Sequence, residues 1–244
     1  MKRMLQVLAV FSLIAAVSCL LPACGGDEAA EVEEIIEEEE GVPEGQLPVF
    51  QVGDTWSWDY ELMGETRTLT ESVTGSETVD GRDCYVIDMS FDPAMSSTHD
   101  GEVYTATRIT YWADKVSGLI GDKMETEVTG GGQTFITTET YSYNPRIELF
   151  PLEIGKTLET ELTTSQFSHG VPMGEPVVTT EKYVVEGKET ITVAAGTFTC
   201  WKIVIYDGDG NVKVTMYYSD LVKSSVKMTS FDGVAMELKS YSVS

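Results

Sequence analysis

A period of two in side-chain polarity is the feature that most limits the folds open to this chain. Apolar and polar residues alternate along Trp56-Ser57-Trp58-Asp59-Tyr60-Glu61-Leu62, and the same alternation recurs in residues 133–143 and 157–163. This pattern predicts β-strands with one buried face. From residue 47 onward, no run of ten residues shows a convincing helical period. We therefore predict an all-β, antiparallel domain over residues 47–244.

Four short blocks occur twice in the same order, which indicates an internal duplication. The pairs are Val52–Trp56 with Ile154–Leu158, Val73–Val79 with Val185–Ile191, Cys84–Ile87 with Cys200–Ile203, and Tyr111–Val116 with Tyr217–Val222. A period of roughly 100 residues is too long for a solenoid or a propeller blade. It favours two copies of one β unit, residues 47–146 and 147–244, that share a core. Such a pair can form a curved sheet or half-barrel, or a sandwich, and the pattern leaves that choice open.

The N-terminus carries the signature of an export signal. Lys2 and Arg3 precede an apolar run from Met4 to Leu21, which is the order found in secretory signal peptides. The ending Leu21-Pro22-Ala23-Cys24 resembles the lipobox of bacterial lipoproteins. That resemblance implies removal of residues 1–23 and acylation of Cys24. The acyl chains would hold the protein on the cell membrane or the outer membrane, with its domain facing the periplasm or the exterior. An uncleaved anchor and a cut before Cys19 are the alternatives.

Acidic residues dominate the rest of the chain. Residues 24–46 contain ten acidic side chains and no basic one, and like charges three or four residues apart oppose a helix. We therefore predict a flexible acidic tether there, with a short helix as the alternative. The whole chain has 40 acidic and 16 basic residues, for a net charge of −24. Such a surface repels phosphate backbones, so no nucleic-acid partner is expected.

The sequence contains no recognisable catalytic or metal-binding motif. Its two histidines, His99 and His169, lie far apart in sequence, and no Gly-x-Ser-x-Gly motif is present. We expect no enzymatic activity, with a hydrolase as the alternative, and we expect no cofactor and no metal. Cys84 and Cys200 are the cysteines of the β domain. Two free thiols are the prediction, and one disulfide is the alternative because an exported protein is in a disulfide-permissive compartment.

The second half resembles a group of bacterial envelope proteins. Val193–Phe198 has the pattern Val-x-Ala-Gly-Thr-Phe, and Met216–Lys223 places an aromatic pair before a Leu-Val-Lys turn. Those proteins are grouped with TapB-like domains and, loosely, with the LolA and LppX half-barrel lipoprotein carriers. The resemblance covers roughly residues 148–230 and, more faintly, 48–120, and it implies a β fold in the envelope. The chain departs from the pattern at Ser219-Asp220-Leu221, which lacks the turn glycine.

Aromatic residues in the predicted strands, many at matched positions of the two halves, are the candidate functional side chains. They are Trp56, Trp58, Tyr85, Trp112, Trp201 and Tyr218. These rings form either an ordinary core or the wall of an apolar cup between curved sheets. The first reading predicts a non-enzymatic, lipid-anchored interaction or structural module that docks another envelope protein. The second predicts a lipid-anchored carrier or binding protein for an apolar, lipid-like ligand.

Overall fold

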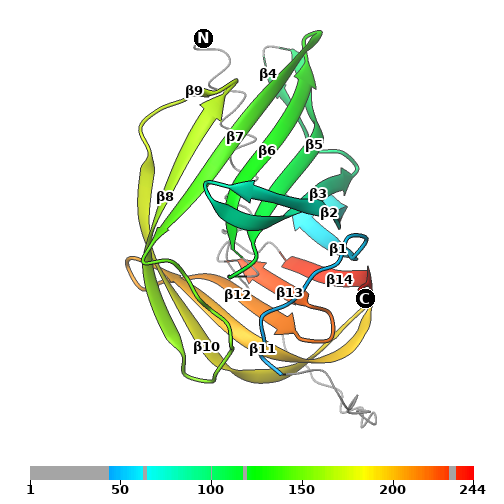
Figure 1. The fold of residues 1–244 in the computed structure, drawn as a ribbon. Helices are drawn as coiled ribbons and strands as arrows, with labels where there is room; N and C mark the ends of the chain where they lie inside the picture. Colours follow the sequence, from blue (N-terminus) through cyan, green and yellow to red (C-terminus); the bar gives the residue numbers. More distant parts are fainter. Residues whose placement is uncertain (1–43, 63–64, 100, 118–119, 231–234) are drawn as a thin grey trace.

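The computed structural model describes residues 44–62, 65–99, 101–117, 120–230 and 235–244 (Figure 1). The predicted signal peptide, Cys24 and all but the end of the predicted tether lie outside these residues. The described part is built from strands, and it contains no helix that could cross a membrane. The strands are β1 (Thr55–Leu62), β2 (Glu65–Val79), β3 (Arg82–Asp92), β4 (Ser96–His99), β5 (Glu102–Asp114), β6 (Gly121–Gly130), β7 (Gln133–Asn144), β8 (Thr157–Ser168), β9 (Val171–Pro172), β10 (Val177–Val193), β11 (Gly196–Asp207), β12 (Val212–Ser219), β13 (Ser224–Ser230) and β14 (Ala235–Ser242).

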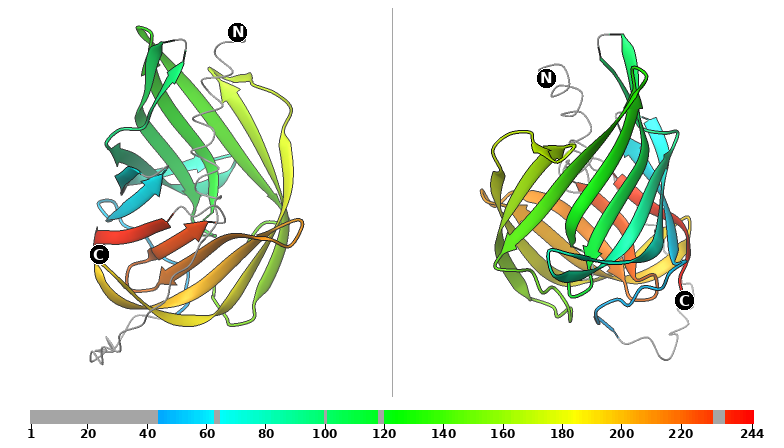
Figure 2. Two further views of the ribbon diagram at one scale, coloured as in Figure 1. Left: turned by 180° about the vertical axis from the view of Figure 1, so that it is seen from behind. Right: turned by 45° about the horizontal axis from the view of Figure 1, so that its top comes forward.

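Twelve of these strands form one closed antiparallel barrel, and Figure 2 shows them curving around a common interior. Each strand of the ring pairs with the next one along the chain, while short β4 and β9 attach to β5 and β8. The ring closes where β14 pairs with β1, from Thr55 opposite Ser242 to Tyr60 opposite Met236. The predicted all-β, antiparallel, curved fold is confirmed. The sheet closes into a ring, with which the predicted curved sheet or half-barrel is compatible, and it does not divide into a sandwich.

The alternation in β1 explains which face of the sheet is buried. Trp56, Trp58 and Tyr60 are only 2–3% exposed, whereas Ser57 and Asp59 between them are half-buried. Successive side chains of a strand point to opposite faces, so the three rings all enter the interior. Burial of such large apolar surfaces is the main force that holds the strands together.

The two halves of the chain repeat one strand plan. The amide of Gly53 donates to Val73 O at 2.9 Å, and the amide of Gly155 donates to Val185 O at 2.8 Å. Both glycines have positive φ angles, 101° and 86°. The predicted boundaries of the halves stay predictions.

The changing offset between the repeated blocks predicts length differences between the halves near residues 92–101 and 192–197, and the structure agrees only in part. Short β4 lies in the loop of the first half, near residues 92–101, where extra length was predicted. The structure also has an extra segment, which includes β9, between β8 and β10. The first half has no described strand between β1 and β2 that would correspond to it. The sequence comparison missed this segment because no repeated block falls inside it.

Each half has one segment ahead of its first strand, β1 or β8, that directs apolar side chains into the interior. Residues 45–54 and 145–156 lie at the lower end of the barrel in Figure 1. Their side chains Phe50, Leu149 and Leu152 are between 1% and 7% exposed. Phe50 packs edge-on against the Trp56 ring, with 5.3 Å between centroids. These segments therefore fill part of a space that the strands alone would leave open.

A buried ionic cluster anchors the second of these segments. Asp114 and Asp122 are 2–3% exposed, and the Arg146 guanidinium lies 2.5 Å from Asp114 and 3.5 Å from Asp122. Arg82 also reaches Asp122, at 3.0 Å. Burial alone would raise the pKa of Asp114, but hydrogen bonds from Arg146 and from the Ser117 amide outweigh it and hold that pKa below its ordinary value. Both carboxylates are therefore buried with a partner, as buried charges must be.

Replacing Arg146 with Ala should destabilise the fold by roughly 3 kcal/mol at neutral pH, because two buried carboxylates lose a cation. The loss should shrink as the pH falls through the lowered pKa of Asp114, since the ion pair stabilises only the ionised acid. Chemical denaturation measures the free energy of unfolding. Lys182→Ala is the control, because its 3.9 Å pair with Glu159 is exposed and should contribute about 0.5 kcal/mol or less. Equal losses in both variants would contradict a structural role for the cluster.

Candidate ligand cavity

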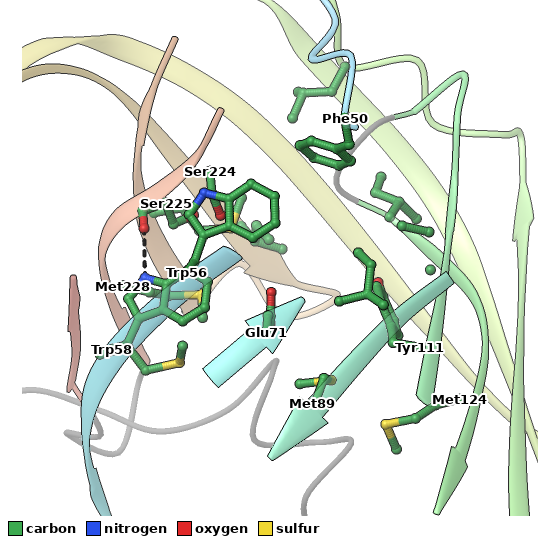
Figure 3. Close-up of a pocket in the computed structure, with 18 of the residues that line it drawn as sticks. Phe50, Trp56, Trp58, Glu71, Met89, Tyr111, Met124, Ser224, Ser225 and Met228 are labelled. Atoms are coloured by element: carbon green, nitrogen blue, oxygen red, sulfur yellow. Dashed lines mark hydrogen bonds between the residues drawn. The ribbon is translucent and has the colours of Figure 1, made fainter. Parts of the chain in front are cut away.

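An apolar cavity of about 200 Å³ lies inside the barrel. Figure 3 shows Trp56 and Trp58 on one side of it and Tyr111 on the other. Its aromatic lining consists of Phe50, Trp56, Trp58, Tyr111, Tyr143 and Tyr183. Large, mostly apolar concave walls with a few polar groups are typical of small-molecule sites.

Both tryptophans of the cavity are fixed in place by hydrogen bonds. The indole N–H of Trp56 donates to Val222 O at 2.8 Å, and that of Trp58 donates to Ser225 O at 2.9 Å (Figure 3). A buried indole N–H needs such a partner. Because the acceptors lie in or next to β13, these bonds also tie β1 to the C-terminal strands. The same two side chains thus hold the barrel together and shape its interior.

Five methionines form the softer part of the lining: Met89, Met124, Met216, Met228 and Met236. Met216, Met228 and Met236 are direct cross-strand partners on β12, β13 and β14. Directly opposed residues on one face have Cβ atoms about 5 Å apart, so the three side chains form one row. Methionine is unbranched and adapts its shape to what it contacts. This wall can therefore adjust to ligands of different outline.

The position of Tyr111 depends on a glycine beside it. A Cβ atom added at Gly121 would lie 2.2 Å from the Tyr111 ring, which is far inside van der Waals contact. The absence of a side chain at Gly121 on β6 therefore leaves the space that the Tyr111 ring occupies. Any larger residue there would displace the ring from its place in the cavity wall.

Within the part of the chain that the structure describes, Glu71 is the one acidic or basic residue that lines this cavity. It lies on β2 directly opposite Trp56 on β1 and Met89 on β3, and Figure 3 shows its carboxyl group directed inward. Its side chain is half-buried because it faces the cavity, and no hydrogen bond or ion pair joins it to another described residue. Burial raises the pKa of Glu71 from 4.5 to about 7. At neutral pH the carboxyl group is therefore close to half-ionised.

The structure places the aromatic candidates from the sequence in two groups. Trp56 and Trp58 line the cavity, whereas Tyr85, Trp112, Trp201 and Tyr218 are buried elsewhere in the core. The Trp112 and Trp201 indoles donate to Glu77 and Asp220, at 2.8 and 2.9 Å. Tyr85 packs against Phe50, with 4.9 Å between ring centroids, and so supports the cavity wall from behind. Cys24 lies outside the described residues.

Sequence reasoning missed Glu71, although the sequence contains a signal for it. Leu69, Glu71 and Val73 share one face of β2, and Leu69 and Val73 are 4% and 2% exposed. An acid at an inward position between two buried apolar residues is unusual, because an unpaired carboxyl group is costly to bury. The sequence signal was that Glu71 alternates in phase with Leu69 and Val73. To use that signal, the register of β2 had to be known.

The cysteines lie in the core and away from this cavity. Cys84 on β3 and Cys200 on β11 are both free and fully buried, which confirms the prediction of two thiols. Burial raises the pKa of each thiol to about 12, and for Cys84 the nearby Asp122 adds to the effect. Thiols of this kind are inert. Within the described residues, no three His, Cys, Asp or Glu side chains are grouped as metal ligands.

Comparisons with known proteins reveal only a distant likeness. No protein-family model and no curated protein matches the chain. Among solved structures, the chain is similar to a candidate exported protein with a YmcC-like fold from Bacteroides fragilis. That match has 12% identity and a TM-score of 0.40, over 79% of this chain and 97% of the other. It is too distant to carry a functional argument, and the resemblance to TapB-like, LolA and LppX proteins stays a prediction.

Replacing Glu71 with Gln should change how stability depends on pH. The raised pKa means that the folded wild type keeps a proton that the unfolded chain loses between about pH 4.5 and pH 7, so wild-type stability falls over that range. Relative to wild type, Glu71→Gln should gain about 2 kcal/mol between about pH 4.5 and pH 8, somewhat less than the full shift implies because the side chain is partly exposed. Denaturation at several pH values measures this difference. Glu61→Gln, at an exposed position of β1, should show no such gain; parallel curves for wild type and Glu71→Gln would refute the assignment.

Proposed function

We propose that this protein is an exported envelope lipoprotein, anchored through Cys24, that binds a small apolar molecule inside its barrel. The cavity lined by Trp56, Trp58 and the methionine row is the observation that carries this proposal. A sheet interface filled by its own side chains would have favoured a docking module instead. The lipobox-like ending at Cys24 supports the anchored, exported location.

The size of the cavity limits the ligand. Pockets for drug-sized ligands measure about 300–1,000 Å³, and this cavity measures about 200 Å³. A lipid with two long acyl chains is too large to be enclosed. The proposed ligand is therefore a single short chain or a small ring system. We propose binding without catalysis, because Glu71 is the one acid among the described lining residues and no histidine, lysine or cysteine accompanies it there.

A docking role is the second candidate, and one surface feature favours it. Val171, Val177 and Val178, on β9 and at the start of β10, are 60–65% exposed. These exposed valines are apolar side chains on the surface of an otherwise acidic protein. Isolated exposed apolar residues are normal on protein surfaces, so this feature carries less weight than the cavity.

Mass spectrometry of the protein purified from the membranes of its expressing cells tests both parts of the proposal. The intact mass should correspond to a chain that begins at Cys24 and carries acyl chains. Organic extraction of the same sample should release a small apolar compound in near-stoichiometric amount. Gly121→Leu is the matched variant, because it would add volume at the cavity wall and displace the Tyr111 ring, and its extract should lack the compound. An unmodified N-terminus would refute the anchor, and equal extracts from both proteins would refute the ligand site.

A further inference from the structure

We propose that the ligand is a small amphiphile whose protonated amine pairs with Glu71 while its apolar part contacts the tryptophans and methionines of the cavity. This inference rests on the proposed function, since it names the chemical class of the molecule held in the same cavity. The inference goes beyond the proposed function by assigning a charge to the ligand. The carboxyl group of Glu71 is the feature that makes the assignment.

The position of Glu71 is costly unless something pairs with it. The carboxyl group is flanked by the side chains of Trp56 and Met89 and has no hydrogen-bond or ion-pair partner among the described residues. Burying a carboxylate without a partner is strongly unfavourable. A purely apolar ligand would remove the remaining solvent from Glu71 and worsen this cost. A ligand with a hydrogen-bond donor or a positive charge removes it.

The remaining lining distinguishes a cationic ligand from an anionic one. Among the described residues, no lysine, arginine or histidine lines the cavity, so a carboxylate or phosphate ligand would find no counter-charge there and would be repelled by Glu71. An ionised carboxylate is a hydrogen-bond acceptor only, which suits the three donors of an ammonium group. The faces of Trp56, Trp58 and Tyr111 also attract ammonium ions, because aromatic rings have a negative face.

Ionisation of Glu71 should make amine binding depend on pH. The other ionisable side chains among the described lining residues are those of Tyr111, Tyr143 and Tyr183, whose hydroxyls are uncharged near neutral pH. Burial raises the pKa of Glu71 to about 7, so the acid gains its charge across the neutral range. Amine affinity should therefore rise between about pH 5 and pH 8, while the affinity for an uncharged ligand of the same length should not.

Titration of the Cys24→Ser chain with octylammonium and with 1-octanol tests the inference. Loss of the acyl chains should permit work without detergent, which would compete for the cavity, and the fluorescence of Trp56 and Trp58 reports occupancy. At about pH 8 octylammonium should bind at least about tenfold more tightly than octanol, as expected for a charge-assisted hydrogen bond. Glu71→Gln should abolish that preference and leave octanol binding intact. Glu61→Gln removes the same charge from an exposed position of β1 and should keep the preference, which controls for general attraction of cations to an acidic protein.

Each outcome separates this inference from the proposed function. Equal binding of amine and alcohol, or an unchanged preference in Glu71→Gln, would overturn the assignment of an amine ligand and leave the apolar site in place. Tighter binding of octanoate than of octylammonium would overturn it as well. If none of the three probes binds, both the inference and the proposed function fail. Should Glu71→Gln not fold, the pH series on the Cys24→Ser chain decides: the amine preference must grow by about tenfold from pH 5 to pH 8, and a flat ratio would overturn the inference.

Discussion

The pairing of β14 with β1 is the interaction on which the rest of the structure depends. Every other neighbouring pair in the ring consists of strands that follow each other along the chain, whereas this pair joins its two ends. Several contacts reinforce the junction. Asp54 accepts hydrogen bonds from the amide and hydroxyl of Ser244, at 3.0 and 3.1 Å. The Trp56 and Trp58 indoles bond to the backbone in or next to β13. Closure leaves no unpaired edge in the ring, and it encloses an interior.

The cavity follows from the number of strands. A barrel of about eight strands is filled by its own side chains, and wider barrels enclose space. This ring has twelve strands, and the segments with Phe50 and Leu149 fill only part of its interior. Large aromatic rings and flexible methionines line the remaining part of the interior. Glu71 lies there too, and the fold itself does not require a carboxylate at that position. The proposed amine ligand gives that residue a role.

The sequence was sufficient to predict the local structure, and it was insufficient for the closure. The alternation around Trp56 predicts a strand without any knowledge of its partners, and the repeated blocks predict one strand plan used twice. The strand that closes the ring on β1 is β14, however, which lies about 180 residues away in sequence. No local turn specifies that pairing. Without the closure, a half-barrel and a sandwich were equally consistent with the pattern. The inward position of Glu71 was equally hidden, because it depends on the register of β2 against β1 and β3.

Hydrogen–deuterium exchange at the C-terminal strand tests the closed barrel most directly. Ser240, Tyr241 and Ser242 pair with β1, whereas the pairing of β14 with β13 covers only Ala235 to Glu237. Protection of amides in residues 240–242 therefore reports the junction alone. We expect that those amides that point toward β1 exchange slowly, to an extent comparable with β2 and β3. Exchange as fast as that of an unpaired chain end, with β2 and β3 still protected, would mean that the barrel is open and that the cavity inside it is not formed.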